Sequence, residues 1–280
     1  MTAAGKPAAR TASGFPYRLV ATDLDGTLIR SDGTVSARTR AALTAAQAAG
    51  AAHLVVTGRS VPWTRHVLDD LGYTGLAVCG QGAQIYDAGE HRMLTSITLD
   101  RTTAQRSVAR LEHELGPLWI AASRDGLDGE VLVDPAGFDT TTKGPLTVRA
   151  CTDRGELWSE PVNKLYLRHP SLSDDDLTRA AHDLVGAAVG VVMAGPGTVE
   201  LLPLGLTKAT GLSLAGRRLG VRGPEAIAFG DMPNDIPMFA WAAHGVAMAG
   251  AHPDLLAVAD EVTAGNDADG IAKVLERLLA

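Results

Sequence analysis

Cysteine is almost absent from this chain of 280 residues, which contains Cys79 and Cys151 and no others. Two cysteines are too few for a disulfide framework or a four-cysteine zinc cluster. We interpret both as small buried hydrophobic residues. Their scarcity favours a reducing environment and predicts a cytoplasmic protein.

Long apolar runs, aromatic residues and an excess of positive charge are also lacking. No run of about 18 apolar residues occurs, so the sequence predicts no membrane-spanning helix. Aromatic residues make up 4% of the chain, and the core must be built mainly from Ala, Val and Leu. The formal net charge of −7 disfavours nucleic acid as a partner. A globular protein of one large domain or two smaller ones remains.

Acidic residues are missing from residues 1–16, MTAAGKPAARTASGFP. This basic segment has no long apolar stretch of the kind that a secretory signal requires. We expect residues 1–16 to form a disordered N-terminal extension.

From Tyr17 onward, short apolar runs alternate with helical patterns. The runs YRLVATD, HLVVTG and LAVCG are predicted to be buried strands, separated by helices over 36–50 and 60–72. Ser36 and Ser60 are expected to cap these helices, and Gly50 and Gly72 to end them. This alternation predicts a parallel sheet with right-handed crossovers.

Residues 84–197 carry a different pattern, in which strand candidates are neighbours and two helical segments lie between them. The segment GQGAQIYDAGEHRMLTSITLD at its start is predicted to form a hairpin. The alternating pattern returns after Gly205 and continues to the end of the chain. We therefore expect an α/β protein with a Rossmann-like parallel-sheet core, residues 17–83 and 198–280. An inserted α+β module, residues 84–197, is expected to interrupt this core.

Polar residues follow the predicted core strands at the points where the strands end. They are Asp23 and Asp25, Thr57 and Gly58, Asp231 and Asp235, with Lys208 opening the helix before the fourth strand. Because the carboxyl ends of parallel strands meet at one edge, these side chains should share a cleft. Clustered carboxylates repel one another unless a cation lies among them, and a set of oxygen ligands suits Mg²⁺. Lys208 and the backbone amides of the Asp-Gly-Thr turn can hold an anion, which predicts a phosphate bridged to a metal.

Taken singly, each of these residues has an ordinary structural interpretation. Asp23 and Asp25 can be turn residues, Thr57 can end a strand, and Lys208 can be a solvated lysine at a helix start. Their joint occurrence in this order favours the site. Two interpretations of Lys164 in VNKLYL stay open, packing within the cap and contact with a substrate.

The segments DLDGTL, VVTGR, LTKATGL and GDMPNDIPM resemble the four ordered motifs of the haloacid dehalogenase superfamily of phosphatases. The segments ELLPLGLTKATGL, HGVAMAGA and NDADGIAKVL resemble its Cof-like branch, which carries an α/β cap between the second and third motifs. The resemblance covers nearly all of the chain from Tyr17. It departs at Gln81, where the family often has Asn, and at Met232 and Pro233, where small or polar residues are common.

The resemblance implies a role for each residue at a matching position. Asp23 is the nucleophile that forms an aspartyl-phosphate, and Asp25 is the general acid and base. Lys208 offsets the negative charge between nucleophile and phosphate. The implied phosphate contacts are Thr57, Gly58, Lys208 and Asn234. The implied Mg²⁺ site consists of Asp23, Asp25 through its backbone carbonyl, Asp231 and Asp235, where Asp235 either supports the metal through water or positions Lys208.

These implied roles predict a Mg²⁺-dependent phosphatase that acts on a small phosphorylated metabolite. A sugar phosphate is the leading substrate class, and a phosphorylated cofactor such as a flavin or pyridoxal phosphate is the second. Two alternatives stay open, a phosphomutase and a non-catalytic protein that binds a phosphorylated metabolite. The sequence predicts no particular oligomeric state.

Overall fold

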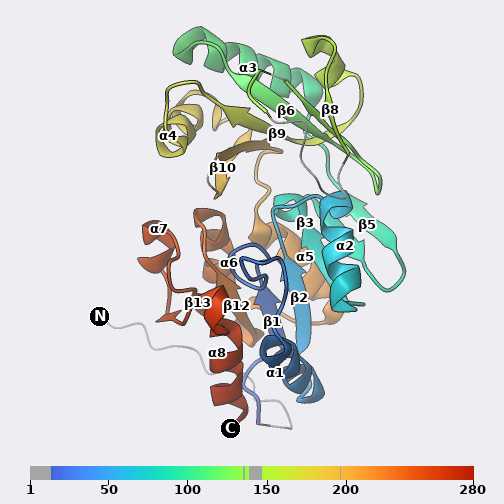
Figure 1. Ribbon diagram of the computed structural model, residues 1–280, viewed down its shortest axis with the longest axis vertical. Coiled ribbons are helices and arrows are strands. Elements are labelled where there is room, and N and C mark those ends of the chain that lie inside the picture. Colours follow the sequence, from blue (N-terminus) through green and yellow to red (C-terminus); the bar gives the residue numbers. More distant parts are fainter. Residues whose placement is uncertain (1–13, 135, 139–146, 196) are drawn as a thin grey trace. The chain divides into compact units, whose positions relative to one another are not determined.

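The computed structural model describes residues 14–134, 136–138, 147–195 and 197–280 (Figure 1). Two compact units divide the described chain. The first comprises the described residues up to Thr57, Gly75–Val78 and Lys208–Ala280, and the second comprises those of Gly58–Thr74 and Cys79–Thr207. Within the predicted extension, residues 1–13 lie outside the described residues. Phe15 is 1% exposed, and its ring lies edge-on to Tyr17.

The first unit contains a parallel sheet with the strand order β14-β13-β12-β1-β2-β3. The strands are β1 (Leu19–Thr22), β2 (Ala52–Val56), β3 (Leu76–Cys79), β12 (Ala226–Gly230), β13 (His244–Ala247) and β14 (Glu261–Val262). The helices are α1 (Ala37–Ala48), α5 (Lys208–Leu219), α6 (Ile236–Trp241), α7 (Pro253–Leu256) and α8 (Gly270–Leu279). Helix α1 packs beside α8, and α5 packs beside α6 (Figure 1). The central strands β1 and β12 are buried along their whole length, as expected for a sheet covered on both faces.

Local capping chemistry sets where the first helices begin and end. The Ser36 hydroxyl accepts the Thr39 amide at 3.0 Å and caps α1, as predicted. Ser60 stands at the N-cap of α2 (Val61–Leu71), but its hydroxyl makes no capping bond, so the expected side-chain cap is wrong. The Val61 amide instead donates to the Gln84 carboxamide oxygen at 3.0 Å. Gly72 ends α2 in the left-handed conformation, with φ +61°, as predicted.

The second unit contains a sheet with the strand order β10-β11-β9-β6-β7-β8. These strands are β6 (Trp119–Arg124), β7 (Val131–Val133), β8 (Val148–Ala150), β9 (Val162–Arg168), β10 (Gly190–Gly195) and β11 (Thr198–Leu202). Helices α3 (Arg101–Leu115) and α4 (Asp174–Val185) cover one face of this sheet (Figure 1). Leu111 and Leu177 pack there against Ile120 and Leu165, and all four side chains are nearly fully buried. The predicted hairpin is present as β4 (Gln84–Asp87) and β5 (Arg92–Ser96).

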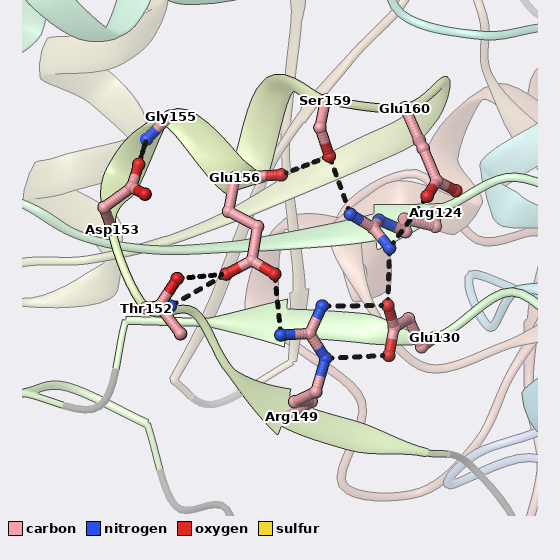
Figure 2. A network of polar contacts seen from close by, with 9 residues as sticks. All are labelled: Arg124, Glu130, Arg149, Thr152, Asp153, Gly155, Glu156, Ser159 and Glu160. Atoms are coloured by element: carbon pink, nitrogen blue, oxygen red, sulfur yellow. Dashed lines mark hydrogen bonds and ion pairs between the residues drawn. The ribbon is translucent and has the colours of Figure 1, made fainter.

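A network of ion pairs joins β6, β7 and β8 to the turn before β9 (Figure 2). Glu130 accepts from Arg124 at 2.5 Å and from Arg149 at 3.3 Å, and Arg149 also pairs with Glu156 at 2.7 Å. Bonds from the Thr152 amide and from Arg149 lower the pKa of Glu156 to about 2. The network fixes the short strand β8, which the hydrophobic pattern alone does not predict.

The predicted fold class is confirmed, because a parallel α/β sheet and a separate α+β sheet are both present. Helix α2, which the sequence pattern assigns to the core, groups with the second compact unit. The domain division at residues 83/84 and 197/198 stays a prediction. Among the residues that the structure describes, every helix is too short or too polar to cross a bilayer.

Candidate active site

Asp23 and Asp231 lie at the same edge of the parallel sheet because the strands before them are in register. Thr22 of β1 stands beside Phe229 of β12, and the Asp23 amide donates to the Phe229 carbonyl at 2.9 Å. Asp231 follows β12 after one glycine. Two acids that are 208 positions apart in the chain therefore reach one point in space, as the sequence predicts.

Among the described residues, Lys208 is the one positively charged residue in contact with these acids. It is the first residue of α5, and its side chain is 1% exposed. Its Nζ donates to Asp23 Oδ1 at 2.6 Å and to Asp235 Oδ1 at 2.7 Å. Burial lowers the pKa of Lys208, but the charges of Asp23 and Asp235 outweigh burial and hold it above its ordinary value. Lys208 therefore stays protonated, and it holds the two carboxylates together.

Asp235 shapes the turn that carries Asp231. The Asp235 side chain is fully buried, and its Oδ2 accepts the backbone amides of Asp231 at 3.0 Å and Met232 at 3.1 Å. These bonds close the 3₁₀ turn Pro233–Asp235 at the start of α6. Because the turn uses the backbone amide of Met232, the departure from the family pattern at Met232 and Pro233 leaves its hydrogen bonds intact.

Gly26 allows the Asp-Gly-Thr turn to close around Asp231. Its φ of +71° lies in the left-handed region, and a Cβ at this position would stand 2.2 Å from Asp231 Oδ2. The next residue, Thr27, donates its hydroxyl to Asp231 Oδ1 at 3.1 Å. The backbone of the first motif thus lies directly against the acid of the fourth.

The electrostatics of the cluster favour an added cation. Oxygen atoms of Asp23, Asp231 and Asp235 lie within 4.8 Å of one another, and Lys208 alone opposes them among the described residues. Burial, reinforced by the neighbouring acids, raises the pKa of Asp23 well above its ordinary value. Burial and the charge of Asp235 raise the pKa of Asp231 to about 6. A divalent cation would remove the repulsion, and oxygen ligands of this kind suit a hard one.

Three other predicted site residues, Asp25, Thr57 and Asn234, follow the carboxyl ends of core strands. Asp25 is exposed and pairs across the loop with Ile29. Thr57 is fully buried just beyond β2, and its amide donates to Val78 at 2.8 Å. Asn234, 8% exposed, lies in the turn after β12. The individual roles of these residues stay predictions.

Sequence reasoning missed the surroundings of Gly58, the residue after Thr57. The Gly58 carbonyl accepts a hydrogen bond from Lys164, and Lys164 pairs with Glu200. Gln81 donates its Nε2 to Glu200 Oε2 at 2.9 Å. The signal that could have revealed this cluster is a single acid, Glu200, between apolar residues of a buried strand.

The parallel sheet with its acid and lysine cluster defines a hydrolase of the haloacid dehalogenase type. The family model for haloacid dehalogenase-like hydrolases matches residues 20–275, and the chain belongs to this family.

Proteins of known sequence and structure are similar to the chain along nearly its whole length. A 5-amino-6-(5-phospho-D-ribitylamino)uracil phosphatase of Bacillus subtilis, YwtE, is 26% identical over 94% of this chain and 98% of its own. An HMP-PP phosphatase of Serratia proteamaculans is 28% identical over 85% and 86% of the two chains. The crystal structure of a haloacid dehalogenase-like hydrolase from Bacteroides thetaiotaomicron matches with a TM-score of 0.73 at 25% identity, over 94% and 99%. These similarities support a phosphoric monoester hydrolase.

Proposed function

We propose that the chain is a Mg²⁺-dependent phosphatase that hydrolyses a small phosphorylated metabolite through an aspartyl-phosphate at Asp23. The observation that carries this proposal is the contact of Lys208 with both Asp23 and Asp235 beside Asp231. A lysine that offsets charge next to a buried carboxylate suits the attack of that carboxylate on phosphorus.

Asp23 and Asp231 are the carboxylates that we assign to the metal, together with the backbone carbonyl of Asp25. Both oxygens of Asp235 already accept hydrogen bonds, so we assign Asp235 to positioning Lys208 and the Asp231 turn. A bound Mg²⁺ would supply positive charge to the carboxylates and to the phosphoryl oxygens. Lys208 supplies a further positive charge in direct contact with the Asp23 carboxylate.

Proton transfer is assigned to Asp25. It is exposed, whereas Asp23 is 5% exposed, so the two acids have different surroundings although one residue separates them. In the first step the Asp23 oxygen bonds to phosphorus, the ester bond breaks, and Asp25 gives its proton to the leaving oxygen. In the second step Asp25 takes a proton from water, which attacks phosphorus and releases phosphate from Asp23. Thr57 and Asn234 are assigned to the phosphoryl oxygens.

A sugar phosphate is the leading substrate class. The relative from Bacillus subtilis is named for a substrate with a phosphorylated ribityl chain, which is a polyol phosphate attached to a heterocycle. This name supports sugar and sugar-alcohol phosphates as the first group to test and flavin-related phosphates as the second. We propose that the protein is cytoplasmic, because its two cysteines are free, as is usual in a reducing compartment.

Phosphate release tests the proposal. We expect the wild-type protein to release inorganic phosphate from p-nitrophenyl phosphate, and faster from one member of a panel of sugar and sugar-alcohol phosphates, only with Mg²⁺ present. Asp23→Asn should lose this activity, whereas Asp32→Asn should retain it because Asp32 is an exposed residue whose carboxylate accepts hydrogen bonds from Thr34, two residues away. Migration of phosphate within the substrate would instead indicate a mutase. Substrate binding with no turnover would indicate a binding protein.

A further inference from the structure

Two opposite charges are buried on neighbouring strands of the second compact unit. Lys164 lies on β9 and Glu200 on β11, and each residue is 1% exposed. Glu200 stands opposite Tyr166 in the antiparallel register, two residues from Lys164 on the same face of the sheet. Lys164 pairs with Glu200, and its Nζ also lies over the Tyr166 ring, 4.6 Å from the centroid.

This pair holds a backbone carbonyl in the loop after the second predicted motif. Lys164 Nζ donates to the Gly58 carbonyl at 2.7 Å, while Glu200 accepts from Lys164 at one oxygen and from Gln81 at the other. Burial lowers the pKa of Lys164, but Glu200 and Tyr166 together outweigh burial and raise it above its ordinary value. Lys164 is therefore charged, and its bonds to the Gly58 carbonyl and to Glu200 are charge-assisted.

Gly58 is fixed from a second side by Gln81. A Cβ at Gly58 would stand 2.6 Å from Gln81 Nε2, so the carboxamide occupies the space that a side chain would need. Gln81 has a left-handed backbone, with φ +58°, which is uncommon for a residue other than glycine. The Gly80 amide also donates to the Arg59 carbonyl at 2.8 Å. The peptide units directly after Thr57 are thus held by hydrogen bonds from Lys164 and Gly80, and the Gln81 side chain packs against Gly58.

Stability alone is a weak reason to bury such a pair. Removing two charges from water has a large free-energy cost, and replacing a buried pair with apolar residues is often neutral or stabilising. What the pair provides is a defined position for its hydrogen-bond partner. Here that partner is the Gly58 carbonyl, one residue from the hydroxyl assigned to the phosphoryl group.

We propose that Lys164 and Glu200 are positioning residues that fix the Thr57–Gly58–Arg59 turn and so aim the Thr57 hydroxyl at the phosphoryl oxygens. This inference rests on the proposed phosphatase function. It also gives Gln81 a role, because its longer side chain reaches Glu200 and fills the space beside Gly58. Lys164 acts through the turn and is not itself assigned a contact with the substrate.

A double-mutant cycle tests whether Lys164 acts through Thr57. Lys164→Met should lower kcat by roughly tenfold to a hundredfold, the range expected for a misplaced catalytic geometry. In the Thr57→Val background the same change should have almost no further effect. Arg168→Met is the matched control, because Arg168 lies on the same strand and binds the carbonyls of Gly137 and Gly197 instead. It should retain the wild-type kcat.

A second variant addresses folding. Lys164→Met leaves Glu200 buried without its cation, so Lys164→Met with Glu200→Gln removes both charges together. Urea unfolding should show this double variant to be folded, and its kcat should still be low. Two results would overturn the inference. One is that Lys164→Met and Thr57→Val lower kcat by independent factors, so that the factors multiply when the two changes are combined. The other is wild-type kcat in the variant that carries both Lys164→Met and Glu200→Gln.

Amide hydrogen exchange separates failure of this inference from failure of the proposed function. We expect the amides of residues 58–60 to exchange roughly tenfold faster in the charge-free double variant than in wild type or Arg168→Met. This readout needs no turnover. If wild-type protein hydrolyses no phosphate ester, the proposed function fails, and unchanged exchange at residues 58–60 would separately refute the positioning role.

Discussion

His53 should make the stability of the protein depend on pH in a way that one substitution removes. His53 lies on β2, is 9% exposed, and shares a hydrogen bond of 2.9 Å between its Nε2 and the Thr22 hydroxyl. Thr22 directly precedes Asp23, so this pair supports the strand end that carries the proposed nucleophile. Burial lowers the pKa of His53 from its ordinary 6.5 to about 4.

The magnitude follows from these two pKa values. The difference between 6.5 and about 4 corresponds to about 3 kcal/mol, at about 1.4 kcal/mol for each pH unit. Because the folded state holds His53 neutral, the unfolded state binds the extra proton. The contribution is therefore fully present above pH 6.5 and is lost as pH falls from 6.5 towards about 4. Between about pH 7 and about pH 5 the loss should be about 2 kcal/mol.

Urea unfolding at these two pH values, in the presence of a chelator, measures this loss. Other groups also titrate in this range, so the informative quantity is the difference between wild type and His53→Gln. His53→Gln should lower the free energy of unfolding at both pH values, but the change between them should be smaller than in wild type by about 2 kcal/mol. His113→Gln is the matched control, because the His113 side chain is 83% exposed.

Two results would refute this reasoning. One is an equal pH dependence of unfolding in wild type and His53→Gln. The other is an NMR titration in which the His53 imidazole takes up its proton near pH 6.5, which would mean that burial does not disfavour its charged form.

Three further predictions concern the proposed site. Lys208→Met should lower kcat for p-nitrophenyl phosphate by about a hundredfold to a thousandfold, with circular dichroism showing a folded protein; wild-type kcat would contradict its role. Gly26→Ala should lower kcat by at least about a hundredfold by pushing Asp231 aside. Gly33→Ala is its control, because Gly33 has a similar φ of +82° but nothing within 4 Å of a Cβ, and equal effects would exclude the steric explanation. Finally, EDTA should abolish turnover and Mg²⁺ restore it, and Mg²⁺ should raise the unfolding temperature of wild type but not of Asp231→Asn; a similar rise in both would argue against Asp231 as a ligand.

Much of the first compact unit was predictable because its signals are local in sequence. The fully buried strands β1 and β12 and the Ser36 cap of α1 each depend on a few consecutive residues. The convergence of Asp23 and Asp231 followed from the rule that parallel strands end at one edge. The hairpin β4–β5 of the second compact unit was also predictable, because its two strands are neighbours in sequence and a short loop joins them.

Features that depend on distant partners were not predictable. Serine is a favourable N-cap residue, yet at the start of α2 the Gln84 side chain, and not Ser60, accepts the hydrogen bond from the Val61 amide. The strands β8 and β14 are too short to give a pattern of their own. The pairing of Lys164 with Glu200 depends on the register of β9 against β11, which the sequence of neither strand specifies.

The phosphorylated form of the protein tests the central claim most directly. The enzyme is mixed with substrate and Mg²⁺, quenched with acid, and reduced with borohydride, which converts an acyl phosphate to a homoserine residue. Mass-spectrometric sequencing of the peptide around the first motif then separates Asp23 from Asp25. We predict that the modification lies at Asp23 alone and is absent without Mg²⁺. Modification of another residue, or steady turnover with Asp23→Asn, would contradict the account.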